Sequence, residues 1–167
     1  MDVVAGWAVR IATRVVPDEL DFAAEVGQAY AAGGKARSDL FPRPGAEPGG
    51  FGVTAMTEEL PVILQALADA AGTLRDLLAT KELGNVVALV GLVVALRRGK
   101  SDVKSPEAAA LDTAQHDLRA GLENSGLPGP RAEEVAYDLL EELLSDPDGA
   151  REFLRRLRGE EGEEDEG

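Results

Sequence analysis

The stretch that most constrains the fold runs from Leu83 to Leu96 and reads LGNVVALVGLVVAL. Its fourteen residues carry no charge, and as a helix they would span about 21 Å, short of the roughly 30 Å hydrocarbon core of a bilayer. The small residues Ala88, Gly91 and Ala95 form one stripe, along which another helix could approach closely. A helix that is apolar on every face is expected at the centre of a bundle.

Three interpretations of this apolar segment stay open: a helix buried in protein, including a homo-oligomer, a membrane contact, or a short buried strand. We favour burial in protein, with Leu89, Gly91 and Ala95 as packing positions. The membrane interpretation draws on the basic residues that follow the segment, which are typical of a contact with the inner leaflet. These residues are Arg97, Arg98, Lys100 and Lys104.

The segment before it, 57–80, has apolar residues at alternating steps of four and three, which predicts one amphipathic helix. Thr57 is the expected cap of this helix. We expect the helix to form an antiparallel hairpin with the apolar helix, with the turn at 81–84. The stripe is more typical of an intramolecular core than of a dimer interface. Its residues are Leu60, Ile63, Leu67, Ala70, Leu74 and Leu77.

Residues 6–16, GWAVRIATRVV, alternate in polarity and are rich in β-branched side chains, which favours a strand over a helix. A helix capped by Asp21 should follow and stop at Gly33 and Gly34. The prolines and glycines of 42–52 then predict an exposed connection. Five of the seven aromatic residues lie in this N-terminal third, so a different kind of core is expected there.

The last third predicts three helices, starting at Ser105 and Pro106, near Arg131, and near Asp146. Leu139, Leu143 and Phe153 are expected on their apolar faces. The chain thus divides into an N-terminal strand and helix segment 1–41, a connection 42–55, a helical hairpin 56–104, C-terminal helices 105–158, and an acidic, disordered tail 159–167. The predicted class is a mainly α-helical small bundle with a central apolar helix and one or two N-terminal β-strands.

Composition argues against most familiar chemistries. A net charge of −14 disfavours nucleic acid as a partner. With no cysteine and one histidine, the chain cannot supply thiolate ligands, a thiol nucleophile or a conventional zinc site. We therefore expect no cofactor and no metal.

Candidate sites in the sequence are weak. The stretch 29–36, AYAAGGKA, lacks the first glycine and the hydroxyl residue of a phosphate loop. His116, four residues after Asp112, is expected to be an exposed helix residue, and the acidic pairs 133–134 and 141–142 are expected to face solvent. A carboxylate enzyme using Mg²⁺ is the least favoured alternative.

Residues 1–16 show no secretory signal, so a cytoplasmic protein is expected, with inner-membrane association as the alternative. Lysine supplies only four of the 17 basic residues, a usage that suggests a bacterial genome of high GC content.

The order of these elements, ending in RRGKSDV at 97–103, is similar in layout to small effector-associated components of actinobacterial NTPase and caspase-like conflict systems. The resemblance covers about residues 6–104 and carries no site residues. It implies a non-enzymatic adaptor or membrane-proximal component that recruits or restrains an effector. We therefore predict a protein-binding or scaffolding component, acting through a protein partner or self-association, at 83–96 and at the helix pair 131–158; the alternative is a short protein anchored in a membrane through 83–96.

Overall fold

The computed structural model describes residues 2–41, 59–79, 86–99 and 106–159, and the regular elements in these ranges are all helical. The mainly α-helical small bundle is therefore confirmed. The elements are α1 (Val3–Val15), the 3-10 helix η1 (Pro17–Phe22), α2 (Ala23–Ala32), α3 (Gly34–Ser38), α5 (Leu60–Asp69), α6 (Ala71–Leu78), α7 (Val86–Arg97), α8 (Pro106–Asn124), α9 (Gly129–Leu144) and α10 (Pro147–Leu157).

The predicted N-terminal strand is wrong, because residues 3–15 form helix α1. The Asp2 carboxylate caps this helix by accepting hydrogen bonds from the backbone N–H groups of Val4 and Ala5, at 3.1 and 3.4 Å. The four-residue spacing of Trp7, Ile11 and Val15 then places all three on one buried face. The cap and this spacing outweigh the strand preference of the β-branched residues.

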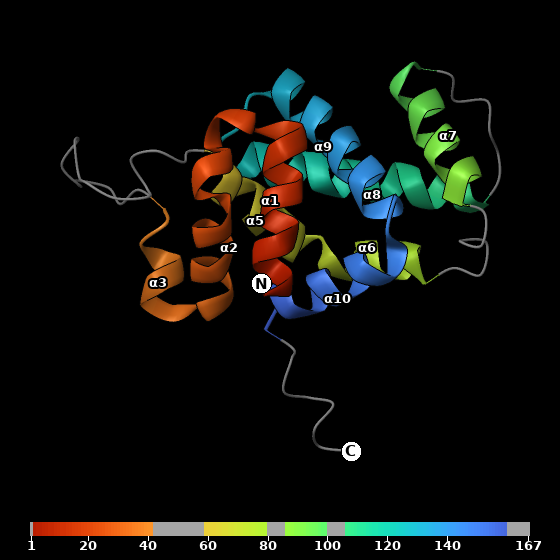
Figure 1. Cartoon of the computed structure of the whole chain (residues 1–167). Helices are drawn as coiled ribbons and strands as arrows, with labels where there is room; N and C mark the ends of the chain where they lie inside the picture. Colours follow the sequence, from red (N-terminus) through yellow and green to blue (C-terminus); the bar gives the residue numbers. More distant parts are fainter. Residues whose placement is uncertain (1, 42–58, 80–85, 100–105, 160–167) are drawn as a thin grey trace.

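Helix α2 lies against α1 as a close pair (Figure 1). It begins at Ala23 with no side-chain cap, since η1 leads directly into it and Asp21 is exposed, so the predicted cap is wrong. Gly27 makes the close approach possible, because a Cβ there would lie 2.9 Å from the Ala5 Cα. The helix ends as predicted at Gly33, whose φ of 72° suits glycine.

The predicted helix 57–80 is two helices in the described range 59–79, because the backbone leaves helical geometry at Ala70 (φ −94°, ψ 5°). The apolar stripe nevertheless stays on the inside of both helices. Thr57, the turn at 81–84 and the connection 42–55 lie outside the described residues.

The helices of the last third start close to where the sequence predicts. Helix α8 begins at Pro106, with Ser105 outside the described residues, and α9 begins at Gly129. Helix α10 begins at Pro147. The preceding residue, Asp146, caps it, because its carboxylate accepts a hydrogen bond from the Gly149 N–H at 3.1 Å. Residues 160–167 of the predicted acidic tail lie outside the described range.

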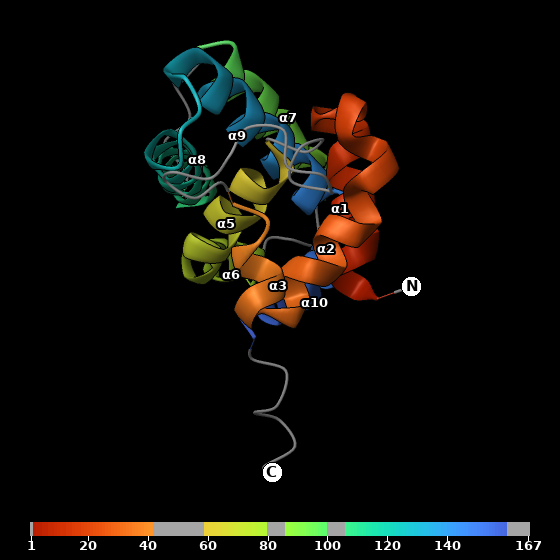
Figure 2. The ribbon, with the colours of Figure 1, turned by 90° about the vertical axis from the view of Figure 1, so that its left-hand side faces the viewer.

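One hydrophobic core joins the two halves of the chain. Helix α10 packs against α1, α5 and α6, and α8 packs against α9 and α5 (Figure 2). The Trp7 ring stacks on the Phe153 ring with centroids 5.2 Å apart. The N-terminal third, where we expected a different kind of core, shares one cluster with the rest of the described residues, because both ends of the chain contribute to it.

Candidate functional site: the outer face of helix α7

Helix α7, which carries most of the apolar segment, lies at the edge of the bundle (Figure 1). Its main contacts are with α9 and α8, not with the α5–α6 pair that we predicted as its hairpin partner. The predicted central position is wrong, because the leucine-rich faces of the other helices already fill the core.

The side chains of α7 are only partly covered. Among residues 90–96, Val93 alone is buried, whereas Gly91 is exposed and Ala95 is partly buried. Nothing lies within 4 Å of the position that a Cβ would occupy at Gly91. The Leu89 side chain lies outside the described set. A helix with no polar residue from 86 to 96 thus presents part of its surface to solvent.

Polar contacts at its carboxyl end hold α7 to α9. The Tyr137 hydroxyl donates to the Leu96 carbonyl oxygen at 3.4 Å, and the Arg97 guanidinium lies 5.9 Å from the centroid of the Tyr137 ring. Arg97 also donates to Asp138 at 2.8 Å and to Glu141 at 3.2 Å. Burial lowers the pKa of Arg97, but these hydrogen bonds outweigh it and hold the pKa above its ordinary value.

The two described basic residues after the apolar segment differ in their contacts. Arg97 faces the acids of α9, while Arg98 is exposed. Lys100 and Lys104 lie outside the described residues.

The same acidic strip of α9 also binds α1. Arg10 pairs with Glu142 at 2.8 Å, and Arg14 pairs with Glu141. The side chains of Asp138, Glu141 and Glu142 are only 16%, 14% and 17% exposed. The predicted solvent exposure of the pair 141–142 is therefore wrong: these acids lie between the arginines of α1 and α7, while Glu133 and Glu134 are exposed as predicted.

The other predicted interaction positions are buried in the core. They are Leu60, Ile63, Leu67, Leu74, Leu77, Leu139, Leu143 and Phe153, each at most 3% exposed. These residues pack the bundle, so the predicted binding surface at 131–158 cannot use Leu139, Leu143 or Phe153 in the folded chain.

Glu19 makes a contact that was not predicted from the sequence. Its buried carboxylate accepts hydrogen bonds from the backbone N–H groups of Glu59 and Leu60 at 3.0 and 2.9 Å, and so caps the start of α5. Arg131 joins the same region, donating to the Val15 carbonyl at 2.9 Å and to Glu59 at 2.8 Å. Only the tertiary fold brings these residues together, since no local spacing relates them.

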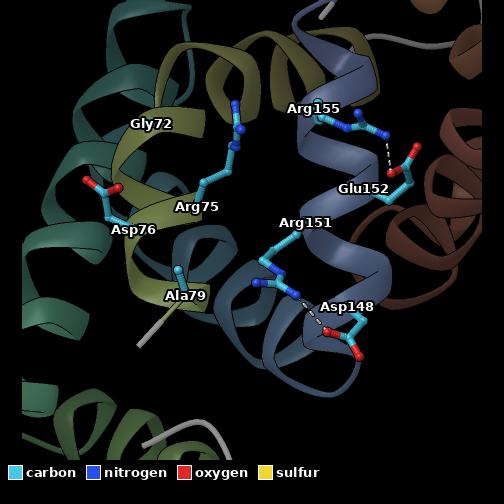
Figure 3. A pocket seen from close by; sticks show the side chains of 8 residues that line it. All are labelled: Gly72, Arg75, Asp76, Ala79, Asp148, Arg151, Glu152 and Arg155. Carbon is cyan, nitrogen blue, oxygen red and sulfur yellow. Dashed lines mark hydrogen bonds and ion pairs between the residues drawn. The ribbon is translucent and has the colours of Figure 1, made fainter. Parts of the chain in front are cut away.

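A second surface feature is an open groove of about 540 Å³ between α6 and α10. Figure 3 shows Arg75 on one wall and Arg151 and Arg155 on the other. Arg151 donates to Asp148 at 3.0 Å, and Glu152 pairs with both Arg155 and Arg156. Hydrogen bonds from Arg156 and Arg155 hold the pKa of Glu152 below its ordinary value.

The weaker candidate sites of the sequence lie on helices. His116 is exposed, with its Nδ1 2.8 Å from the Asp112 carbonyl oxygen. The stretch 29–36 forms the end of α2 and most of α3. Within the described ranges, no three His, Cys, Asp or Glu residues group closely enough to hold a metal ion. No described helix has the length and hydropathy needed to cross a membrane.

Comparison with known proteins gives no relative from which a role could be carried over. No protein-family model, no curated protein and no solved structure matches the chain. The partly covered face of α7 is thus the candidate site that the chain's own geometry supports best.

Proposed function

We propose that this protein is a non-catalytic scaffolding component that associates with a second copy of itself through the outer face of α7. The observation that carries the proposal is the coverage of residues 90–96: all are apolar, and only Val93 is buried. Each Å² of apolar surface removed from water contributes about 25 cal/mol, so covering this face favours association.

The shape of α7 favours a helix of another copy as the occupant. Twelve helical residues span about 18 Å, well short of the roughly 30 Å hydrocarbon core. Helices that lie flat on a membrane need a strongly polar face, and α7 has none between residues 86 and 96. A second α7 offers a matching apolar face, and two-fold pairing is the commonest arrangement of identical subunits.

Gly91 supports the same proposal. A glycine inside a helix costs about 1 kcal/mol relative to alanine, and no described neighbour of Gly91 requires the missing side chain. Pairing of two copies would use it, since small residues such as Gly91 and Ala95 let helix backbones come close. The resemblance in layout to effector-associated components would make such a dimer an adaptor.

Sedimentation velocity over a range of concentrations tests the proposal with Gly91→Arg. The new side chain has open space in a single copy, so the thermal midpoint should not fall, but it would block close pairing. We expect a concentration-dependent dimer in the original chain and a monomer in the variant. Ala120→Arg, at an exposed position of α8, is the matched control and should still dimerise.

A monomer at every concentration would overturn the proposal. Flotation with vesicles of anionic phospholipid then distinguishes the alternative: binding that Gly91→Arg removes in a monomeric protein would assign the α7 face to a membrane instead. A dimer that persists in Gly91→Arg would place the interface elsewhere and would equally contradict the proposal.

A further inference from the structure

Helix α7 buries less of itself than the helix on which it lies. Among its residues 90–96 only Val93 is buried, whereas seven of the sixteen residues of α9 are buried. Its main contacts are with α8 and α9, at the edge of the bundle (Figure 1). Elements that bury few apolar side chains open with a smaller free energy than the core does. The packing that holds α7 in place is therefore weak compared with the packing of the core.

The polar contacts described between α7 and α9 lie in the last turn of α7. The Leu96 carbonyl oxygen accepts a long hydrogen bond from the Tyr137 hydroxyl, at 3.4 Å. Arg97 donates to Asp138 at 2.8 Å and to Glu141 at 3.2 Å. The residues from 86 to 96 have no polar side chain that could add another contact. A small set of hydrogen bonds at one end thus fastens the helix.

The acids that hold Arg97 have a second partner in α1. Arg14 pairs with Glu141 and lies 3.8 Å from Asp138. Breaking a buried ion pair is costly mainly because it leaves a charge without a partner. If α7 moves away, Asp138 and Glu141 keep Arg14, and the partly exposed Arg97 becomes fully hydrated. Departure of α7 therefore leaves no buried charge unpaired at this contact.

Gln115 of α8 is a buried amide without an acceptor. It is 3% exposed, and its Nε2 has no hydrogen-bond partner in the part of the chain that the structure describes. The helix repeat places it on the side of α8 that carries Asp112 and Arg119. This side faces Tyr137: burial raises the pKa of that phenol, and the charges of Asp112 and Arg119 also act on it, in opposite directions. A buried donor without an acceptor destabilises the arrangement that buries it, and water relieves this cost.

We propose that α7 opens from the bundle as a unit while the other described helices stay folded. It then acts as a lid over the side of α8 and α9 that carries Gln115 and Tyr137. Hydration of the Gln115 amide favours the open state, whereas burial of Val93 and the contacts of Arg97 favour the closed state. The proposal is independent of the pairing through the outer face of α7.

Cysteine labelling tests the proposal, because the chain has no cysteine of its own. Val93→Cys places a thiol on the inner side of α7, and Val135→Cys makes the same change in α9; both positions are 0% exposed. In dilute solution, we expect a thiol reagent to modify Val93→Cys about 100-fold or more faster than Val135→Cys. Urea should accelerate the first reaction weakly and the second steeply, since a local opening exposes less surface than global unfolding.

Three further substitutions, each made in both cysteine variants, show what holds and what releases α7. Arg97→Gln should raise the labelling rate of Val93→Cys several-fold, and Gln115→Leu should lower it, with smaller effects on Val135→Cys. Arg151→Gln, which removes an exposed arginine of α10, is the control and should change neither rate.

Equal labelling rates or equal urea dependence for the two cysteines would overturn the proposal, because α7 would then open only when the whole chain unfolds. Labelling of Val93→Cys that is insensitive to both Arg97→Gln and Gln115→Leu would overturn it as well. The expected difference between the two cysteines should persist in the Gly91→Arg background, so a failure of the pairing proposed above would leave this result unchanged.

Discussion

Glu19 shows how one buried side chain can define the start of a distant helix. Its two carboxylate oxygens accept the N–H groups of Glu59 and Leu60, which the first turn of α5 leaves without helical partners. The negative charge also lies at the positive end of the helix dipole. A carboxylate from 40 residues away thus does the work of a local cap.

We expect Glu19→Gln to lower the free energy of unfolding by about 1–2 kcal/mol, the usual range for a lost helix cap. The amide keeps one acceptor but loses the charge and the second acceptor. Urea titration followed by circular dichroism measures the change. Asp18→Asn removes the same charge from an exposed neighbour and should cost much less; equal losses would contradict the role of Glu19.

Tyr30 links α2 to α5 through a buried hydroxyl. It donates to the Gln65 side-chain oxygen at 2.9 Å, and the Arg37 guanidinium lies 4.2 Å from the ring centroid. Burial raises the pKa of Tyr30 from 10.0 to about 12, while Arg37 opposes the rise. The neutral phenol is therefore the form that the folded state prefers.

This raised pKa predicts a loss of stability in alkali. Because the pKa is higher in the folded chain than in the unfolded one, the stabilisation is complete below pH 10 and is lost as the pH approaches 12. A shift of this size corresponds to roughly 2–3 kcal/mol. Urea titrations at several pH values measure the loss of stability. Tyr30→Phe should abolish the part of this loss that comes from ionisation of the Tyr30 phenol. Tyrosinate absorbance of Tyr137→Phe, which leaves Tyr30 as the only tyrosine, should titrate near 12 rather than near 10.

Among the elements, the pair α1–α2 depends on a glycine for its close contact. A Cβ at Gly27 would lie 2.9 Å from both the Ala5 Cα and the Ala8 Cβ, and 3.0 Å from the Val4 carbonyl oxygen. Two of these three atoms belong to the backbone, so the contact can be relieved only if the helices separate.

We therefore expect Gly27→Ala to destabilise the protein by about 1–3 kcal/mol, the usual cost of overpacking a core. The same substitution at Gly91, where nothing lies within 4 Å, should stabilise the helix by up to about 1 kcal/mol. Urea titrations in dilute solution measure both changes. A stabilising Gly27→Ala would show that the two helices can move apart at little cost.

How well each element could be predicted depends on where its determinants lie. Helices α8 and α10 have Pro106 and the Asp146–Pro147 pair at their starts, which are local signals. The first helix is expected as a strand because its apolar residues fit both periods and many are β-branched, whereas the Asp2 cap and the four-residue spacing of the buried face favour the helix.

The candidate site was predicted only in part. The apolar run identified α7 as the unusual helix, but periodicity cannot say whether such a helix lies in the centre or at the edge. In the structure α7 lies against α9, where Arg97 pairs with Asp138 and Glu141, which are 41 and 44 residues away. The groove between α6 and α10 was not predicted, because Arg75 and Arg151, on its two walls, are 76 residues apart in the sequence.

The whole molecule is organised around a core to which both ends of the chain contribute. Trp7, the only tryptophan, stacks on Phe153 of the last described helix. Residues from α1, α5, α8, α9 and α10 belong to the same cluster. The N-terminal helices therefore should not unfold separately from the rest.

Urea titration followed by Trp7 fluorescence and by far-ultraviolet circular dichroism should accordingly give the same midpoint, as for a two-state domain. Phe153→Ala should shift both midpoints together, by an amount equivalent to about 3–5 kcal/mol. A fluorescence transition that precedes the loss of helix would instead indicate an N-terminal unit that unfolds first.

We expect Arg131 to lengthen the lifetime of the folded state. Its guanidinium joins α9 to the Val15 carbonyl and to Glu59, across 116 and 72 residues of chain. Three elements must already have met before this junction can form, so we expect it to be absent from the folding transition state. Interactions of that kind slow the escape from the native state without speeding its formation, which makes Arg131 a determinant of kinetic persistence.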